Sequence, residues 1–135
     1  MEMLTSPKTE YLLQASLEVL HEQSLEYLNE IAFIKEEIAF FNTLLNKNAG
    51  RQFPSEQSAA FGKELVSFNS GVVSVLQNKI MEHERWLSDI IKTDTLGRQE
   101  SYRNIHREVT EEMNACHKRY FQLKKSIFSF VKSQE

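Results

Sequence analysis

The chain has 135 residues, long enough for one domain with a core of its own, and its formal net charge of −3 is moderate. Only four glycines and two prolines are present, with no hairpin signal and no sustained period-two alternation, which excludes a β-sheet protein and indicates an all-α one. No apolar run approaches about 18 residues, and Met1 to Lys8 lack the apolar segment of a signal peptide. We therefore expect a cytoplasmic protein that neither spans nor binds a membrane.

A first helix is predicted from about residue 7 to residue 48. Ser6 followed by Pro7 is typical of a helix start, because serine caps free amides and the missing N–H of proline costs nothing in the first turn. Apolar residues then recur in alternating steps of three and four, interrupted only by Ser24, at Leu13, Leu17, Leu20, Tyr27, Ile31, Ile34, Ile38, Phe41 and Leu45. Such steps place the side chains on one stripe, as in a coiled coil, so this helix needs partners of similar length.

A second helix is predicted over residues 55–93, after an extended linker at Phe53-Pro54. Its stripe comprises Phe61, Leu65, Phe68, Val72, Leu76, Ile80, His83, Leu87 and Ile90. The triplet Asn69-Ser70-Gly71 is the weak point of this helix, because a turn there would give a four-helix bundle instead. We expect the helix to continue, since the stripe passes through the triplet and a glycine inside a helix costs only about 1 kcal/mol.

A third helix, over residues 96–132, follows the polar break Thr93-Asp94-Thr95. Its stripe comprises Tyr102, Ile105, Val109, Met113, Cys116, Tyr120, Leu123, Ile127 and Phe130. Helices of about forty residues would extend about 60 Å, and short loops make neighbouring helices antiparallel. The prediction is therefore a single domain over residues 1–135, an elongated up-down-up three-helix bundle with the shape of a spectrin repeat.

Charge is distributed unevenly between the first and third helices. Residues 1–50 contain three basic and eight acidic residues, whereas residues 101–135 contain seven basic and four acidic residues. This complementarity favours packing of the two helices against each other. The cations Lys118, Arg119, Lys124 and Lys125 alternate with apolar residues at core spacing, and no known binding motif accompanies them, so no nucleic-acid partner is predicted.

The sequence contains no motif of a known catalytic chemistry. It has no glycine-rich phosphate loop, no paired cysteine motif and no serine nucleophile in a tight turn. Cys116 is the only cysteine and falls on the third stripe, which indicates a small buried residue rather than a reactive thiol. A non-enzymatic protein is therefore the favoured interpretation, and the sequence leaves the question of an enzyme open.

Three of the four histidines fall at one height in the predicted bundle. With loops near residues 51 and 95, His21 lies level with His83, which in turn lies level with Arg107 and next to His106. Imidazoles from three helices, with Glu18 one turn from His21, are ligands typical of a divalent metal such as zinc or iron. The alternative is a polar layer, in which the histidines hydrogen-bond to their neighbours and fix the register of the helices.

Two phenylalanines lie behind the main stripe of the first helix. Phe33 and Phe40 are seven residues apart, align with Val19 and border Leu44, and Phe128 lies off the third stripe in a similar way. Two stacked aromatic rings on one back face suggest that another surface covers them. A homodimer interface at these residues is one explanation, and burial by the bundle itself is the other.

The sequence therefore predicts a non-enzymatic helical bundle without a cofactor that acts through protein–protein contacts and self-associates as a homodimer. The rival prediction is a metal-binding bundle, a metal carrier or small oxidase, with one zinc or iron ion on His21, His83, His106 and Glu18. The sequence specifies neither the biological process nor a partner other than a second copy.

Overall fold

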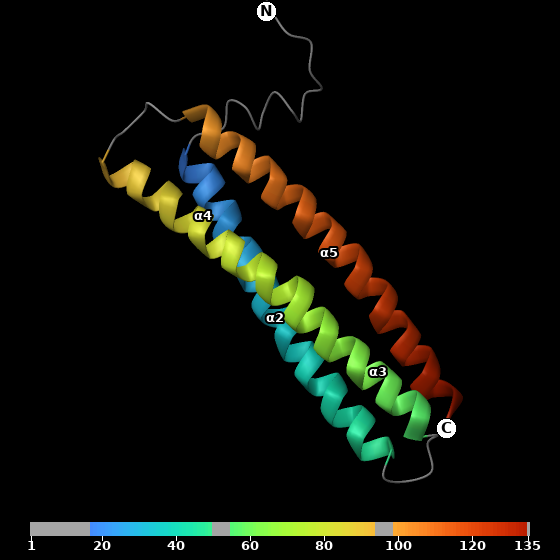
Figure 1. The fold of residues 1–135 in the computed structure, drawn as a ribbon. Helices are drawn as coiled ribbons and strands as arrows, with labels where there is room; N and C mark the ends of the chain where they lie inside the picture. Colours follow the sequence, from blue (N-terminus) through green and yellow to red (C-terminus); the bar gives the residue numbers. More distant parts are fainter. Residues whose placement is uncertain (1–16, 50–54, 94–98, 135) are drawn as a thin grey trace, which may run out of the picture.

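A computed structural model of the chain describes residues 17–49, 55–93 and 99–134. Its elements are α2 (Leu17–Ala49), α3 (Ser55–Phe68), the short π-helix η1 (Asn69–Val73), α4 (Ser74–Thr93) and α5 (Gln99–Ser133). These ranges contain helices and no strand, which confirms the all-α prediction (Figure 1). None of the described helices is long and apolar enough to cross a membrane. The predicted helix starts at residues 7 and 96, with Leu13, lie outside the described residues.

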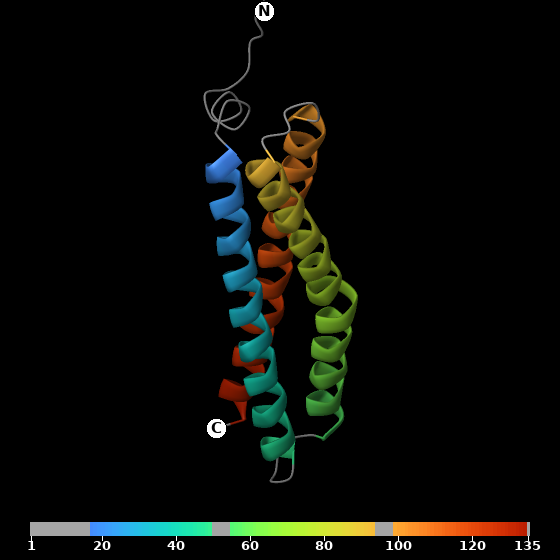
Figure 2. The same ribbon diagram turned by 90° about the vertical axis from the view of Figure 1, so that its left-hand side faces the viewer.

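The described helices form three rods. The elements α3, η1 and α4 follow one another without reversal of the chain, so together they make the middle rod between α2 and α5 in sequence (Figures 1 and 2). The alternative of a turn at Asn69-Ser70-Gly71, which would have given a four-helix bundle, is therefore wrong. The segment does depart from a regular α-helix, and it does so as a single π turn.

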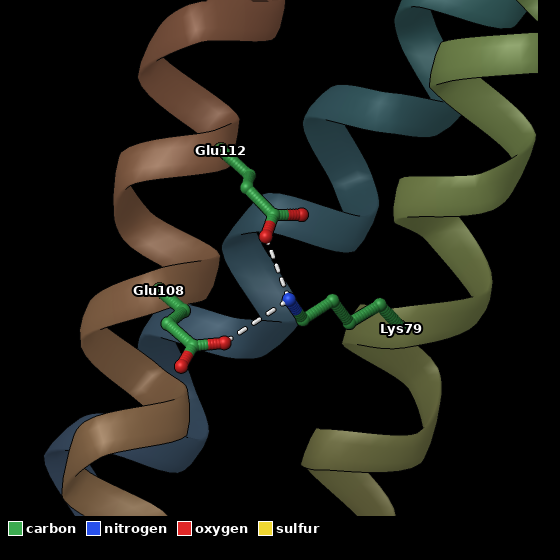
Figure 3. A network of polar contacts seen from close by, with 3 residues as sticks. All are labelled: Lys79, Glu108 and Glu112. Atoms are coloured by element: carbon green, nitrogen blue, oxygen red, sulfur yellow. Dashed lines mark hydrogen bonds and ion pairs between the residues drawn. The ribbon is translucent and has the colours of Figure 1, made fainter.

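Side-chain contacts define the direction of each rod. His21 Nε2 lies 2.6 Å from Glu84 Oε2, whereas Lys35 Nζ, further along α2, lies 3.1 Å from Asn69 Oδ1, so α2 and the middle rod run antiparallel. The middle rod and α5 are also antiparallel neighbours. Lys79 of α4 reaches across to α5, where its Nζ lies 2.6 Å from Glu112 Oε2 and 3.3 Å from Glu108 Oε1 (Figure 3).

The helices α2 and α5 therefore run parallel, and their contacts show a fixed register. In the side-chain hydrogen bonds that join the described parts of these two helices, the α5 partner lies 83 or 87 positions further along the chain. The pairs are Gln23 with His106, Tyr27 with Thr110, Glu30 with His117, and Glu37 with both Tyr120 and Lys124. A constant separation of this kind is possible only between helices that run in the same direction.

The core consists of two apolar clusters with buried polar side chains between them. The larger cluster fills the bundle from Ile31, Ile80 and Val109 towards the end near Phe130. The smaller cluster lies at the other end and contains Leu20, Leu87, Ile90 and Tyr102. Between them lie the buried side chains of Ser24, His83 and His106. The interruption of the first stripe at Ser24 thus coincides with the boundary between the clusters, and its hydroxyl donates a hydrogen bond to the carbonyl of Leu20 at 3.0 Å.

Two further sequence predictions concern the core. Cys116 is buried, and this burial raises the pKa of its thiol, as is typical of a small packed residue. Among its described residues, the middle rod buries one apolar residue that the predicted stripe does not contain. Val73 is fully buried, whereas the predicted stripe residue Val72 is only half-buried.

The π turn explains this difference. The step from buried Phe68 to buried Val73 is five residues, and the backbone N–H of Ser74 bonds to the carbonyl of Asn69, the spacing of a π-helix. Lys35 of α2 hydrogen-bonds to both ends of this turn. Its Nζ donates to Asn69 Oδ1 and, at 2.7 Å, to Ser74 Oγ. The extra residue is thus absorbed within one turn, and the stripe on either side of it faces the same core.

The sequence contains a signal for this insertion. Phe68, Val72, Leu76 and Ile80 require three successive steps of four, where a coiled-coil stripe alternates three and four. Because this run carries one residue more than the alternating pattern, a regular α-helix would rotate its stripe away from the core. The π turn removes that rotation and gives steps of five, three and four.

Deletion of Gly71 should therefore preserve the fold. Gly71 is exposed within the π turn, and its removal should restore a regular α-helix with an alternating stripe. The loss of a Lys35 hydrogen bond, about 1 kcal/mol, is offset by the removal of an interior glycine, about 1 kcal/mol. Urea denaturation should show a change in the free energy of unfolding within about 1 kcal/mol.

Deletion of the exposed Asn78, in regular α4, is the matched control. It rotates one part of the stripe relative to the other by about 100° and should cost several kcal/mol, as large core rearrangements do. Equal losses in the two variants would contradict this interpretation of the π turn.

Candidate functional site

Two candidate sites follow from the sequence predictions, and the first is the polar layer in the core. We use this name for Gln23 of α2, His83 of α4 and His106 of α5. His83 Nε2 lies 3.0 Å from His106 Nδ1, and His106 Nε2 lies 2.7 Å from Gln23 Oε1. Each of the three rods thus contributes one side chain, and both imidazoles are buried, with exposures of 3% and 2%.

The hydrogen bonds assign the protons of the two neutral imidazoles. The amide oxygen of Gln23 only accepts, so His106 carries its proton on Nε2 and offers the lone pair of Nδ1 to His83. His83 then donates from Nε2, which leaves its Nδ1 as a bare acceptor. This Nδ1 is buried and has no hydrogen-bond partner among the residues that the structure describes. The layer is therefore a chain of hydrogen bonds in which His83 donates to His106 and His106 donates to Gln23.

Burial keeps both imidazoles neutral. Removal from water, together with smaller contributions from the neighbouring His106 and Lys79, lowers the pKa of His83 to about 4. Burial alone lowers the pKa of His106 to about 4. Aromatic rings surround the pair, with Tyr27 stacked on His106 at 6.2 Å between centroids and Trp86 edge-on to His83 at 6.5 Å.

The predicted metal ligands do not all meet. His83 and His106 are in contact, but His21 instead lies against Glu84, and Glu18 is exposed on the first turn of α2. Within residues 17–49, 55–93 and 99–134, no group of three or more His, Cys, Asp and Glu side chains is arranged to hold a metal ion. The arrangement matches the alternative of a polar layer, and metal binding by these residues stays a prediction.

The second candidate site is a set of exposed phenylalanines on the surface of α2 and α5. Phe33 and Phe40 of α2 are 59% and 61% exposed, and Phe121 and Phe128 of α5 are 59% and 54% exposed. We call these four residues the aromatic face. Each pair is seven residues apart, two turns of a supercoiled helix, so each forms a line along its own helix. Burial of Phe33 and Phe40 by the bundle itself, the alternative considered above, is wrong.

The two lines of the aromatic face lie on one side of the molecule. A hollow of about 350 Å³ has Phe33 on one wall and Tyr120 and Lys124 on the other, and Lys124 also lines a hollow with Phe121 and Phe128. Near the C-terminal end of α5, Phe128 packs edge-on against Phe41, which in turn contacts Phe40. The other two predicted interface residues, Val19 and Leu44, are half-buried and pack against the core clusters.

The charged residues that border this face differ between the two helices. Glu37 of α2 accepts hydrogen bonds from Tyr120 at 2.8 Å and Lys124 at 3.1 Å, and Glu30 lies 2.6 Å from His117. Burial, together with the bond to Glu37, raises the pKa of Tyr120, so its hydroxyl keeps its proton and donates. The α2 side of the face is therefore acidic and the α5 side basic, and the two helices are joined by pairs of these groups.

Phe121 was not identified from the sequence. It lies next to Tyr120, which occupies the core stripe, and Phe128 was singled out alone. The signal was the spacing of seven residues between Phe121 and Phe128, the same spacing that had identified Phe33 and Phe40.

Comparisons with protein-family models, with curated proteins and with solved structures find no match to this chain.

The polar layer predicts acid sensitivity. Because the folded pKa values of His83 and His106 are about 4 and the ordinary value is 6.5, the unfolded chain binds protons first as the pH falls. The free energy of unfolding is therefore unaffected by these groups above about pH 6.5. It falls by roughly 3 kcal/mol per histidine as the pH drops towards 4. Urea denaturation between pH 7 and pH 4 should show this loss in the wild type.

The double variant His83→Leu/His106→Leu should show a much weaker pH dependence, because it removes both buried imidazoles. His117→Gln, which changes an exposed histidine, should retain the wild-type slope. A double variant whose stability falls as steeply as that of the wild type would contradict the assignment of this effect to the polar layer.

Proposed function

We propose that this protein is a non-enzymatic helical bundle that acts through protein–protein contacts, and that the aromatic face is its contact surface for a second copy. The observation that carries the proposal is the exposure of four phenylalanines on two adjacent parallel helices. Single exposed apolar residues are normal on a protein surface, whereas several aromatic side chains on one side of two neighbouring helices indicate an interaction site.

Burial of the aromatic face would contribute favourable free energy to association. A phenylalanine that becomes fully buried contributes roughly 1.5 to 3 kcal/mol, and each copy offers four that are more than half exposed. The hollow beside Phe33 can receive a side chain from the partner, since Ile34 and Tyr120 contribute apolar surface to its lining. Aromatic residues that enter such hollows at the centre of an interface are typical anchors of binding.

A second copy fits this surface because the face is complementary to itself. It carries acidic residues along α2 and basic residues along α5, so one copy presents both signs. A protein partner of another sequence would need an apolar surface with a complementary arrangement of charges. Two identical chains supply it without any further requirement, as in other closed dimers.

The double variant Phe33→Glu/Phe40→Glu should be monomeric. Four carboxylates at a symmetric interface would have to be desolvated, which costs more than the apolar contact contributes. Sedimentation equilibrium should show a concentration-dependent dimer for the wild type and a monomer for the variant.

The matched control is Val66→Glu/Val75→Glu, which places the same charges on residues that are 58% and 59% exposed on the middle rod. This control should dimerise like the wild type. A wild type that remains monomeric at all concentrations would refute the proposal.

Metal binding is the second candidate function, favoured only by the direct contact of His83 and His106. As a carrier or small oxidase, the protein would have to recruit a third ligand through rearrangement, because His21 is engaged with Glu84. Elemental analysis of protein supplied with zinc or iron tests this candidate. Stoichiometric metal that is lost in His83→Ala would support it over the polar layer.

A further inference from the structure

We propose that two copies dock with α2 of each against α5 of the other, related by a twofold axis that runs along the bundle. This inference rests on the proposed function and specifies the orientation of the dimer. The interface would then be a group of four parallel helices, two from each copy, with the aromatic faces at its centre.

Only two twofold arrangements bring this face against its own copy while keeping the helices of the two copies aligned. The axis must lie in the plane of the interface, and it can run either along the helices or across them. An axis along the helices places α2 opposite α5 of the partner, with all four helices parallel. An axis across the helices places α2 opposite α2 and α5 opposite α5, with the two copies antiparallel.

The charges at the edges of the face distinguish these arrangements. On α5, Lys118, Lys125 and Lys132 recur every seven residues, and the last two line a hollow with Phe121 and Phe128. On α2, Asn29 lines the hollow beside Phe33, and the exposed Glu36 follows seven residues later on the same edge. An axis along the helices brings the acidic edge against the basic edge twice, whereas an axis across them opposes like charges, which is unfavourable.

The internal register of each copy sets the heights of these groups. Hydrogen bonds join α2 to α5 residues 83 or 87 positions later, so Glu36 lies at the height between Lys118 and Lys125. A twofold axis along the helices preserves height, and the partner therefore presents both lysines to Glu36. The phenylalanines meet in the same way, since the line of Phe33 and Phe40 then faces the line of Phe121 and Phe128.

Charge reversal tests the orientation. Glu36→Lys and Lys118→Glu each replace two symmetric attractions with repulsions, so each should weaken the dimer roughly tenfold. An equimolar mixture of the two variants should recover the wild-type dissociation constant, because each reversed edge then meets its complement. Lys63→Glu, at an exposed position of α3, is the control and should leave dimerisation unchanged.

Analytical ultracentrifugation of each variant and of the mixture separates the possible results. Weakening by both single variants, with recovery in the mixture, supports the inference. A wild-type dimer that neither single variant weakens overturns this orientation and leaves the proposed function intact. A wild type that is monomeric throughout overturns both, and circular dichroism at 222 nm checks that each variant is folded.

Discussion

The parallel, fixed register of α2 and α5 is the constraint on which the rest of the structure depends. The middle rod separates these two helices in sequence and returns the chain, so that α5 runs in the direction of α2 and meets it through long side chains such as Tyr27, Glu37 and Lys124. Because both helices follow a spacing of seven residues, a line of phenylalanines on one runs beside a line on the other. The aromatic face therefore results from the topology together with the register, and from neither alone.

The polar layer explains how this register is specified. Apolar seams tolerate a slip of one heptad, because one aliphatic side chain replaces another at similar cost. A slip would instead leave His83 and His106 buried without each other and without Gln23, and a buried polar group that lacks a partner costs about 1 to 3 kcal/mol. The pair lowers the stability that a fully apolar core would have, and in exchange it fixes the relative heights of all three rods. The Lys35 contacts with both ends of the π turn fix the middle rod in a similar way near its centre.

Much of the fold could be predicted from the sequence, because helix periodicity is a local property. The stripes, the continuity of the middle rod and the closeness of His83 and His106 all follow from spacing and from loop positions. The partner of His21 could not be predicted, since a side chain at the edge of a stripe turns to whichever neighbour the local supercoil brings within reach, here Glu84. The exposure of Phe33 also depends on how far apart α2 and α5 lie, a distance that long polar pairs set and periodicity does not. Burial of Val73 does not follow from a regular helical stripe, because the three equal steps of four from Phe68 to Ile80 place Val72 there; those same steps mark the inserted residue.

The central claim is that the aromatic face is covered in solution by a second copy. Hydroxyl-radical footprinting of the wild type at low and high protein concentration measures this directly, because labelling reports the solvent exposure of individual side chains. The account predicts that labelling of Phe33, Phe40, Phe121 and Phe128 falls as concentration rises, while labelling of the equally exposed Val66 and Val75 stays constant. Labelling of the four phenylalanines that does not change with concentration would contradict it.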